Sequence, residues 1–382
     1  MAHSLVLIAG ETSGDMHGAL LAQRLRERMP HISLAGIGGE RMRAAGVETF
    51  ADFSSMAVVG FWEIIKHLRN YKKFFDQTLA YIAKQRPQAV VLIDFPGFNL
   101  RLAQRIRRDF PAIKIIYYIS PQVWAWGAGR IALIKNVVDR MLVVFAFEEE
   151  LYRRHGVPAV FVGHPLHEHL REAEETAAPL ALAFSDGHPR IALLPGSREM
   201  EICRLLPVML AAAQRLRATH PTLRFLLFKA PPVEQALLAA HLRRHGDLPL
   251  TIIDKHHYQY LKQCRFAWVC SGTATLETAL VGTPLLIVYR TSFLTWFISR
   301  LLIKIPYIGL ANIVAGEKIA DEFVQFSATA SNIARATENF LTSPSAEHIR
   351  AKLTGMRAKL GEKKASECAA EEILAVLKHT VP

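Results

Sequence analysis

The sequence predicts an α/β protein built from two doubly wound parallel-sheet domains that face a crevice. Strand-length apolar runs alternate with helix-length amphipathic segments along the chain of 382 residues, a pattern typical of strand–helix–strand units. The strand runs are continuous in Val, Ile and Leu, as expected of parallel strands that are buried on both faces. A polar, acidic stretch at Leu170–His188 is poor in strand formers and therefore indicates the domain junction.

The first domain is expected to span residues 1–165. Its strands are predicted at Leu5–Ala9, Ile32–Ile37, Ala89–Asp94, Lys114–Ser120, Arg140–Phe145 and Ala159–Gly163. Helical stretches lie between these strands, for instance Asn99–Phe110, which ends just before Pro111. Such an order of elements predicts a sheet covered by helices on both faces.

The second domain is expected to span residues 166–345. Its strands are predicted at Arg190–Leu194, Leu223–Lys229, Leu250–Asp254, Arg265–Cys270 and Pro284–Tyr289. The tail from Ala346 is rich in Lys, Glu and Ala, and this composition predicts helices.

Composition narrows the possible partners and compartments. The formal net charge of +12 favours an anionic partner such as a phosphate, a nucleic acid or an acidic membrane surface. The four cysteines form no C-x-x-C pair, so we expect no structural zinc site. Scattered cysteines of this kind are typical of reduced thiols in a cytosolic protein. The N-terminus lacks the features of a signal peptide. No run reaches the roughly 18 apolar residues that a membrane-spanning helix needs.

Unusual polar clusters follow the carboxyl ends of five predicted strands. The clusters are Gly10–Asp15, Asp94–Asn99, Ser120–Trp126, Pro195–Glu199 and Ser271–Glu277. Ligands bind at this edge of open α/β sheets, so the clusters predict ligand sites in both domains.

Two clusters of the second domain are suited to a nucleotide diphosphate. Gly196 and Ser197 form a small-residue turn before a helix, where backbone N–H groups and the helix dipole favour an anion, and Arg198 would add a bidentate phosphate donor. Glu277 could accept the hydroxyls of a ribose, as the acidic residue of dinucleotide folds does. The alternatives are a capping turn with a solvated Arg198 and a carboxylate favoured by the helix dipole.

The turn that leads to Glu277 supplies the other expected donor contacts. These are Ser271, Gly272, Thr273 and Ala274. The sequence has no G-x-x-x-x-G-K-[ST] loop and no G-x-G-x-x-G after its first strand, which argues against an ATPase or a dehydrogenase.

The first domain supplies the candidate catalytic groups. Asp94 ends an apolar strand beside aromatic residues, and a partly apolar cleft can raise a carboxyl pKa toward the range of a general base. Glu11 and Ser13 lie in a loop fit to hold sugar hydroxyls or an acceptor phosphate. In each case a loop that only caps a helix is the alternative. Trp124 and Trp126 lie in a predicted loop, where they could form an aromatic platform for a sugar. The alternative is that they belong to the core or to a lid.

Two segments have the pattern of basic amphipathic helices that lie in a bilayer interface. Their expected membrane contacts are Phe61, Trp62, Leu68, Phe75, Trp296 and Phe297. The alternative is that each helix packs on a sheet and exposes a solvated basic face. The presence of two such segments in one chain favours the interpretation that they contact a membrane.

The ordered motifs resemble those of the lipid-A-disaccharide synthase family. They are found at Ala9–Asp15, Val58–Glu63, Asp94–Asn99, Ser120–Trp126, Phe161–Pro165, Leu193–Arg198, Ser271–Glu277 and Asn312–Gly316. The resemblance covers roughly residues 5 to 325. It implies two Rossmann-like domains in a glycosyltransferase fold of the B type, with the C-terminal helices 346–382 packing back on the first domain.

The resemblance also implies an activity. A family member transfers 2,3-diacylglucosamine from UDP-2,3-diacylglucosamine to the 6-hydroxyl of 2,3-diacylglucosamine 1-phosphate, with inversion and release of UDP. By resemblance, Asp94 is the general base; Arg198, Glu277 and Asn312 contact the donor; and Glu11 and Ser13 lie near the reacting sugars. No metal or other cofactor is expected.

The implied setting is cytoplasmic, at the cytoplasmic face of the inner membrane. The expected partners are the two sugar substrates and an anionic membrane surface, with no nucleic acid and a possible homodimer through the C-terminal helices. Gly97 and Ala311 depart from the family pattern, which affects acceptor-side details and the backbone beside Asn312. The alternatives are a UDP-sugar 2-epimerase and a non-enzymatic protein that binds a membrane or a nucleic acid through its net charge of +12.

Overall fold

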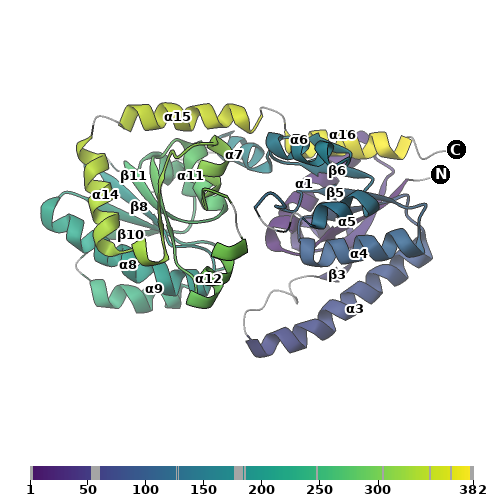
Figure 1. The fold of residues 1–382 in the computed structure, drawn as a ribbon, viewed down its shortest axis with the longest axis horizontal. Coiled ribbons are helices and arrows are strands. Elements are labelled where there is room, and N and C mark those ends of the chain that lie inside the picture. The colour runs from purple at the N-terminus through teal and green to yellow at the C-terminus, as the bar shows by residue number, and fades with distance from the viewer. Residues whose placement is uncertain are drawn as a thin grey trace. The chain divides into compact units, whose positions relative to one another are not determined.

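The computed structural model divides the chain into two compact units. One unit comprises Met1–Pro165 with Leu360–Pro382, and the other comprises Leu166–Lys359 (Figure 1). The structure describes residues 3–52, 61–125, 127, 129–175, 184, 186–246, 248–302, 305–343, 346–361 and 364–378.

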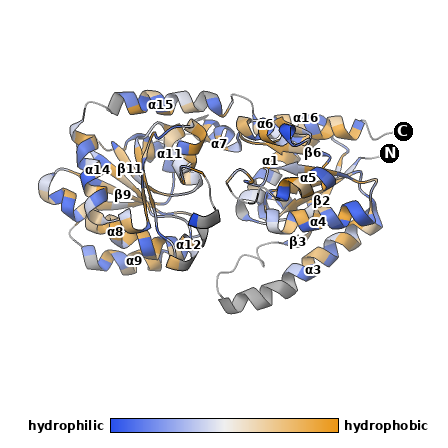
Figure 2. Ribbon diagram, viewed as in Figure 1, coloured by the Kyte–Doolittle hydropathy of each residue, from blue (hydrophilic) through white to orange (hydrophobic). Residues whose placement is uncertain are grey.

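The first unit is built on a parallel sheet. Its strands are β1 (Ser4–Ala9), β2 (Ser33–Gly38), β3 (Glu48–Asp52), β4 (Ala89–Ile93), β5 (Lys114–Tyr118), β6 (Arg140–Val143) and β7 (Ala159–Phe161). In the described residues they form one seven-stranded sheet in the order β3-β2-β1-β4-β5-β6-β7. Every residue of β4 is buried, and much of the sheet has the orange of hydrophobic residues in Figure 2. This is the burial expected of a parallel sheet covered on both faces.

Helices connect these strands. They are α1 (Thr12–Arg28), α2 (Glu40–Ala44), α3 (Phe61–Gln85), α4 (Pro96–Asp109), α5 (Arg130–Val137), α6 (Ala146–Arg154) and, from the C-terminus, α16 (Ala365–Lys378). Pro165, the last residue of the first of this unit's two segments, begins α7 (Pro165–Glu175), which continues into the second unit. Helix α4 illustrates the packing, because Phe98, Leu102 and Ile106 recur at helical spacing and are each no more than 1% exposed.

The second unit repeats the plan with a smaller sheet. Its strands are β8 (Arg190–Leu194), β9 (Arg224–Phe228), β10 (Leu250–Ile253), β11 (Phe266–Cys270), β12 (Leu285–Tyr289) and β13 (Asp321–Val324). Among the described residues these strands pair in parallel in the order β10-β9-β8-β11-β12-β13. The prediction of two doubly wound parallel-sheet domains is thus confirmed.

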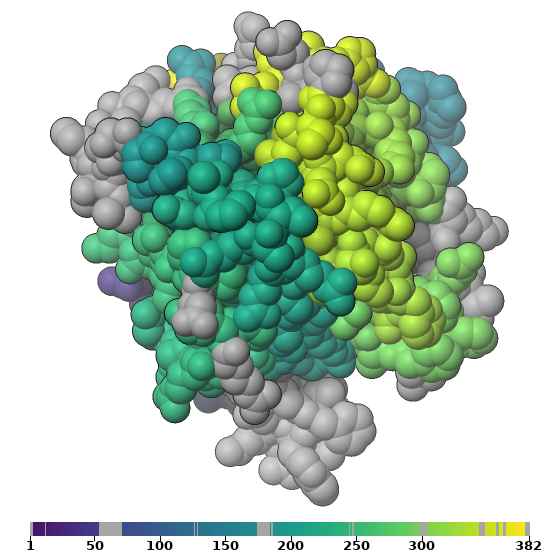
Figure 3. Space-filling model, turned by 90° about the vertical axis from the view of Figure 1, so that its left-hand side faces the viewer, coloured from purple at the N-terminus to yellow at the C-terminus, as the bar shows by residue number. Residues whose placement is uncertain are grey.

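The helices of this unit cover its sheet. They are α8 (Glu199–Thr219), α9 (Gln235–Leu242), α10 (His257–Lys262), α11 (Thr273–Val281), α12 (Phe293–Leu302), α13 (Leu310–Ala315), α14 (Ala330–Thr342) and α15 (Ala346–Lys359), with short 3₁₀ turns at Arg243–His245 and Gln325–Ser327. Helix α14 packs along α8, and in Figure 3 its yellow-green surface adjoins the teal surface around α8.

The C-terminal tail differs from the expectation that all of residues 346–382 pack on the first domain. Helix α15 packs on α11 and α13 of the second unit, where Lys352 pairs with Glu317 at 2.6 Å. Helix α16 packs on α1 of the first unit, and Arg28 pairs with Glu371 at 2.7 Å. The chain therefore returns to the first unit at Leu360.

The strand order reverses once in each sheet. In the first sheet β1 lies between β2 and β4, and in the second β8 lies between β9 and β11. The chain leaves β1 and β4 on opposite sides of the sheet, which opens a crevice at their carboxyl ends, and the same holds for β8 and β11. The loops that follow these four strands are therefore the places to seek a site.

Candidate functional site

Asp94 and the Gly10–Asp15 loop meet at the reversal point of the first sheet. Strands β1 and β4 pair directly, with Ala9 opposite Ile93, so the residues that follow them are neighbours. Glu11 is close enough for its carboxylate to raise the pKa of Asp94. The register of the strands thus places these two segments side by side.

The backbone at Asp94 is held in an uncommon conformation. Asp94 and Phe95 both have φ of 48°, in the left-handed region that side chains other than glycine rarely adopt. The carbonyl of Asp94 accepts hydrogen bonds from the Asn99 amide at 2.7 Å and from the Tyr117 hydroxyl at 2.6 Å. Asn99 is fully buried. Strain of this kind persists where surrounding contacts enforce it, and it clusters at functional sites.

The pKa of Asp94 is raised to about 6, first by burial and second by the Glu11 carboxylate, while a hydrogen bond from the Phe95 N–H lowers it. Phe95 supplies an apolar wall, because a Cβ at Gly10 would lie only 2.2 Å from its ring. Gly10 is therefore required for this ring to pack against the loop. A carboxyl with this pKa is ionised at neutral pH and still basic enough to accept a proton as a bond forms.

Asp15, in the same loop, has a structural role. Its carboxylate accepts the backbone N–H groups of Gly39, Arg41 and Met42 at 2.6–3.1 Å and thereby caps α2. Glu11 and Ser13 are exposed at the start of α1. Of the acidic residues in this loop, Glu11 is therefore the one placed to meet a ligand.

Glu148 is a residue that the sequence analysis missed. It is 1% exposed, and burial raises its pKa to about 7, against hydrogen bonds from Trp124 and others that lower it. Its carboxylate accepts the Trp124 indole N–H at 2.9 Å and the Phe145 N–H at 3.2 Å. Trp124 is thus anchored to β6–α6 rather than free as a sugar platform. Trp126 lies outside the described residues.

The Pro195–Arg198 turn lies at the reversal point of the second sheet and depends on glycine. Gly196 has φ of 119°, and a Cβ there would lie 2.4 Å from a Glu201 carboxylate oxygen. Glu201 accepts the backbone N–H groups of Ser197 and Arg198 at 3.0 and 3.2 Å and pairs with the Arg198 guanidinium at 2.9 Å. A carboxylate from the chain itself therefore occupies the donors that we expected to hold a phosphate.

The Ser271–Glu277 turn follows β11, which pairs with β8, and so lies beside the Arg198 turn. Gly272 has φ of 147°, and Thr273 beside it is exposed while Ala274 is half-buried. The Ser271 hydroxyl donates to the carbonyl of Ile308 at 2.9 Å, which fixes the turn.

Burial raises the pKa of Glu277 although a hydrogen bond from Tyr258 lowers it. Its expected partner, a ribose, would therefore compete with the Tyr258 hydroxyl. The residue as a whole is partly exposed, whereas its carboxylate lies in a buried environment.

Asn312 has a structural role instead of an open amide. It is fully buried. Its amide nitrogen donates to Glu322 and to the Ala320 carbonyl, both at 2.9 Å, while its oxygen accepts the N–H groups of Ile319 and Ala320. A direct nucleotide contact would require some of these bonds to break, so the expected role of Asn312 as a donor contact does not follow from this geometry.

The membrane residues divide into three groups. Phe75 packs edge-on against Phe98 at 5.8 Å and lies against the core of the first unit, so it faces the protein and not a bilayer. Phe61, Trp62 and Leu68 belong to α3, but their side chains lie outside the described part of the chain.

On α12, Phe297 is 51% exposed and Trp296 is half-buried, so α12 keeps the pattern of an interfacial helix. Within the described residues, none of the helices is long and apolar enough to traverse a bilayer. The same part of the chain contains no group of three His, Cys, Asp or Glu residues arranged to hold a metal ion.

The comparisons with known proteins cover almost the whole chain. The family described as "Lipid-A-disaccharide synthetase" matches residues 5–375. A lipid-A-disaccharide synthase of Geobacter sulfurreducens is 42% identical over 377 residues, which are 98% of this chain and 97% of that protein. The chain belongs to this family. A further synthase, from Nitrosococcus oceani, is 40% identical over 94% of this chain and 92% of its own length.

Solved structures with a similar fold are much more distant in sequence. The UDP-GlcNAc 2-epimerase of Neisseria meningitidis, bound to UDP-GlcNAc, has a TM-score of 0.64 at 12% identity, over 97% of this chain and all of that one. CalG4, the calicheamicin glycosyltransferase, has a TM-score of 0.64 at 15% identity over the full length of both. These likenesses confirm the predicted glycosyltransferase B-type fold.

Proposed function

We propose that this protein transfers 2,3-diacylglucosamine from UDP-2,3-diacylglucosamine to the 6-hydroxyl of 2,3-diacylglucosamine 1-phosphate. Membership of the synthase family supports the reaction class. The observation that carries the mechanism is Asp94, a carboxyl with a pKa of about 6 at the reversal point of the first sheet. The second sheet offers two glycine turns at its own reversal point, as a nucleotide diphosphate would need.

Asp94 is proposed as the general base. An alcohol has a pKa far above neutrality, so its attack on the anomeric carbon requires removal of the hydroxyl proton as the new bond forms. The left-handed backbone and the hydrogen bonds to the Asp94 carbonyl hold the main chain in one conformation at this residue. Inversion follows, because the hydroxyl oxygen attacks the face opposite the departing UDP.

Arg198 and the backbone of its turn are proposed to stabilise the leaving diphosphate. The phosphate oxygens would replace the Glu201 carboxylate, which now accepts from Ser197, Arg198 and the Arg198 guanidinium. Gly272, Thr273 and Ala274 provide a second turn at the start of α11. Arginine and helix N-termini supply positive charge where the diphosphate leaves. We expect the reaction to need no cofactor.

The proposal also includes the cellular location of the protein. Both sugar substrates carry acyl chains, so the protein should work at an anionic membrane surface, which we place at the cytoplasmic face of the inner membrane. The aromatic residues of α12 support this through their exposure. The homodimer through the C-terminal helices stays a prediction.

The test is a UDP-release assay with the purified full chain. UDP should form only when UDP-2,3-diacylglucosamine and the acylated sugar phosphate acceptor are both present. A 2-epimerase would instead convert a UDP-sugar to its epimer without any acceptor. Acceptor-independent turnover, or no UDP release with both substrates, would contradict the proposal.

A further inference from the structure

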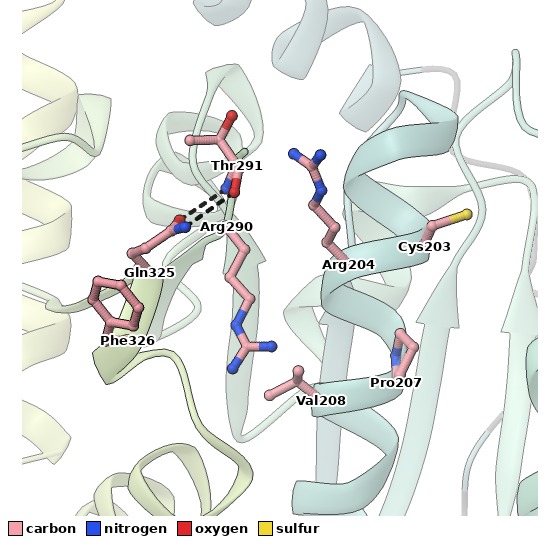
Figure 4. Close-up of a pocket in the computed structure, with 8 residues that line it drawn as sticks. All are labelled: Cys203, Arg204, Pro207, Val208, Arg290, Thr291, Gln325 and Phe326. Carbon is pink, nitrogen blue, oxygen red and sulfur yellow. Dashed lines mark hydrogen bonds between the residues drawn. The ribbon is translucent and has the colours of Figure 1, made fainter. Parts of the chain in front are cut away.

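A cavity of about 560 Å³ lies in the second unit, beside α8. Helix α8 provides one wall with Arg204 and Val208. The segments that follow β12 and β13 provide the other, with Arg290 and Gln325. Figure 4 shows both arginine side chains in the space between these walls. The cavity lies at the carboxyl edge of the sheet, because β12 ends at Tyr289 and β13 at Val324.

The described side chains that line the cavity carry positive charge without a neighbouring negative charge in its lining. Among the described residues, no Asp or Glu lines it, and neither Arg204 nor Arg290 belongs to an ion pair there. The Nε atom of Arg290 is buried without a hydrogen-bond partner in the described structure. A buried donor without a partner is costly, and each of the guanidinium groups that line the cavity favours an anion with several oxygens, such as a phosphate.

The wall that carries Arg290 is fixed in place. The Gln325 side chain accepts the Thr291 N–H and donates to the Thr291 carbonyl, both at 3.1 Å. Gln325 itself has φ of 53°, in the left-handed region. These bonds join the ends of β12 and β13, so the backbone beside Arg290 is held in place before any ligand arrives.

The rim of the cavity is aromatic and exposed. Phe326 lines the cavity and is 68% exposed, and Phe293 and Phe297 of α12 are 63% and 51% exposed. The ring of Phe326 lies 5.3 Å from Trp296 and 6.5 Å from Phe293. Exposed aromatic rings contribute nothing to binding a free anion, but they partition into the boundary between headgroups and acyl chains.

We propose that Arg204 and Arg290 bind the phosphate of a membrane phospholipid while the aromatic rim enters the bilayer interface. A phospholipid joins the two chemistries that the surface offers, an anionic phosphate and adjacent apolar chains. The inference rests on the proposed work at a membrane and not on the transfer chemistry. The proposed membrane contact would then include a defined site for a lipid headgroup, in addition to the general attraction between a basic protein and acidic lipids.

The experiment measures co-sedimentation of the full chain with vesicles of phosphatidylglycerol mixed with phosphatidylcholine. General electrostatic attraction gives about fivefold in affinity for each basic residue near the surface. The double variant Arg204→Ala/Arg290→Ala should lose at least tenfold per residue removed. The matched control is Arg265→Ala, which removes the same charge from an exposed position at the other edge of the same sheet, and it should lose fivefold or less.

Calorimetry separates the alternatives. The affinity for UDP should be unchanged in the double variant, and UDP release from detergent-dispersed substrates should persist. A large loss of UDP affinity with unchanged vesicle binding would assign the cavity to the donor site and overturn the proposal. So would tight binding of inorganic phosphate to the wild-type protein combined with full vesicle affinity in the double variant. Equal losses of vesicle affinity per residue in the double variant and in the Arg265→Ala control would mean that net charge alone causes the binding, and this would also contradict the proposal.

Discussion

Replacing Asp94 by Asn removes the proposed base while keeping a side chain of the same shape. Asn tolerates the left-handed backbone as well as Asp does, so the φ of 48° should be kept. The carboxamide has nearly the same size, but it cannot accept the proton of the attacking hydroxyl. Turnover should therefore fall by at least about 10², while the affinity for UDP, which we propose binds the other unit, should barely change.

The pKa of Asp94 sets the expected pH profile. With a pKa of about 6, roughly a tenth of this carboxyl is ionised at pH 5, so wild-type turnover should drop about tenfold between pH 7.5 and 5. The residual rate of Asp94→Asn should lack this acidic limb. In Glu11→Gln the limb should move to lower pH, because the Glu11 carboxylate contributes to the raised pKa of Asp94.

The same raised pKa predicts a gain in stability. The pKa of Asp94 rises from its ordinary value near 4 to about 6, which corresponds to a cost of about 3 kcal/mol for the ionised form in the folded state. Below pH 4 the carboxyl is neutral in both states and there is no cost. The cost grows as pH rises from 4 to 6 and is complete above that. Asp94→Asn should therefore raise the free energy of unfolding by up to about 3 kcal/mol at pH 8 and hardly at pH 4.

Turnover by UDP release and unfolding by denaturant, each at several pH values, test this reasoning. His17 lies in α1 after the Gly10–Asp15 loop, and His164 lies in the segment after β7. Either histidine could be the base instead, so His17→Ala and His164→Ala are measured beside Asp94→Asn. If Asp94→Asn kept most of the activity while one of these variants were inactive, the base would be misassigned. An acidic limb that survived in Asp94→Asn would also contradict the account.

The other predictions concern groups that the structure fixes by contacts. Arg198→Ala should weaken UDP binding by about 2 kcal/mol, through the loss of a charge-assisted phosphate contact; an unchanged Kd in calorimetry would remove Arg198 from the donor site. Gly196→Ala should destabilise the fold by about 1–3 kcal/mol, because of its positive φ and the collision with Glu201, and an unaltered denaturation midpoint would count against it. Asn312→Ala should cost about 2–4 kcal/mol in unfolding experiments through its lost buried hydrogen bonds; a loss of UDP affinity without a loss of stability would restore its role as a donor contact. Trp124 fluorescence should titrate near pH 7 with Glu148, and the transition should vanish in Glu148→Gln; its persistence there would point to another group.

The central part of the fold could be predicted from the sequence because buried parallel strands leave a strong signal. Runs such as Ala89–Asp94 are continuous in aliphatic residues, and their ends carry the polar clusters of the site. The edge strands β3 and β13 were missed. Their sequences, Glu48–Asp52 and Asp321–Val324, mix charged and apolar residues, because an edge strand needs neither two buried faces nor an apolar run.

The roles of individual motif residues were less accessible. Asp15 and Asn312 stand in motifs that suggested ligands, yet their side chains are occupied by backbone groups outside those motifs. Glu148 is one of three consecutive glutamates, and only the fold reveals which of them is buried. Phe75 has the spacing of an interfacial face, but the same spacing suits packing on Phe98. Local sequence does not record which partner a side chain meets.

The most direct test of the central claim is the structure of the product. The wild-type chain would be incubated with UDP-2,3-diacylglucosamine and 2,3-diacylglucosamine 1-phosphate, and the anomeric coupling and linkage would be read by NMR. The account predicts a β-linked disaccharide joined through the 6-hydroxyl, with one UDP for each bond formed. An α-linkage, another linkage position, or an epimerised UDP-sugar without disaccharide would contradict it.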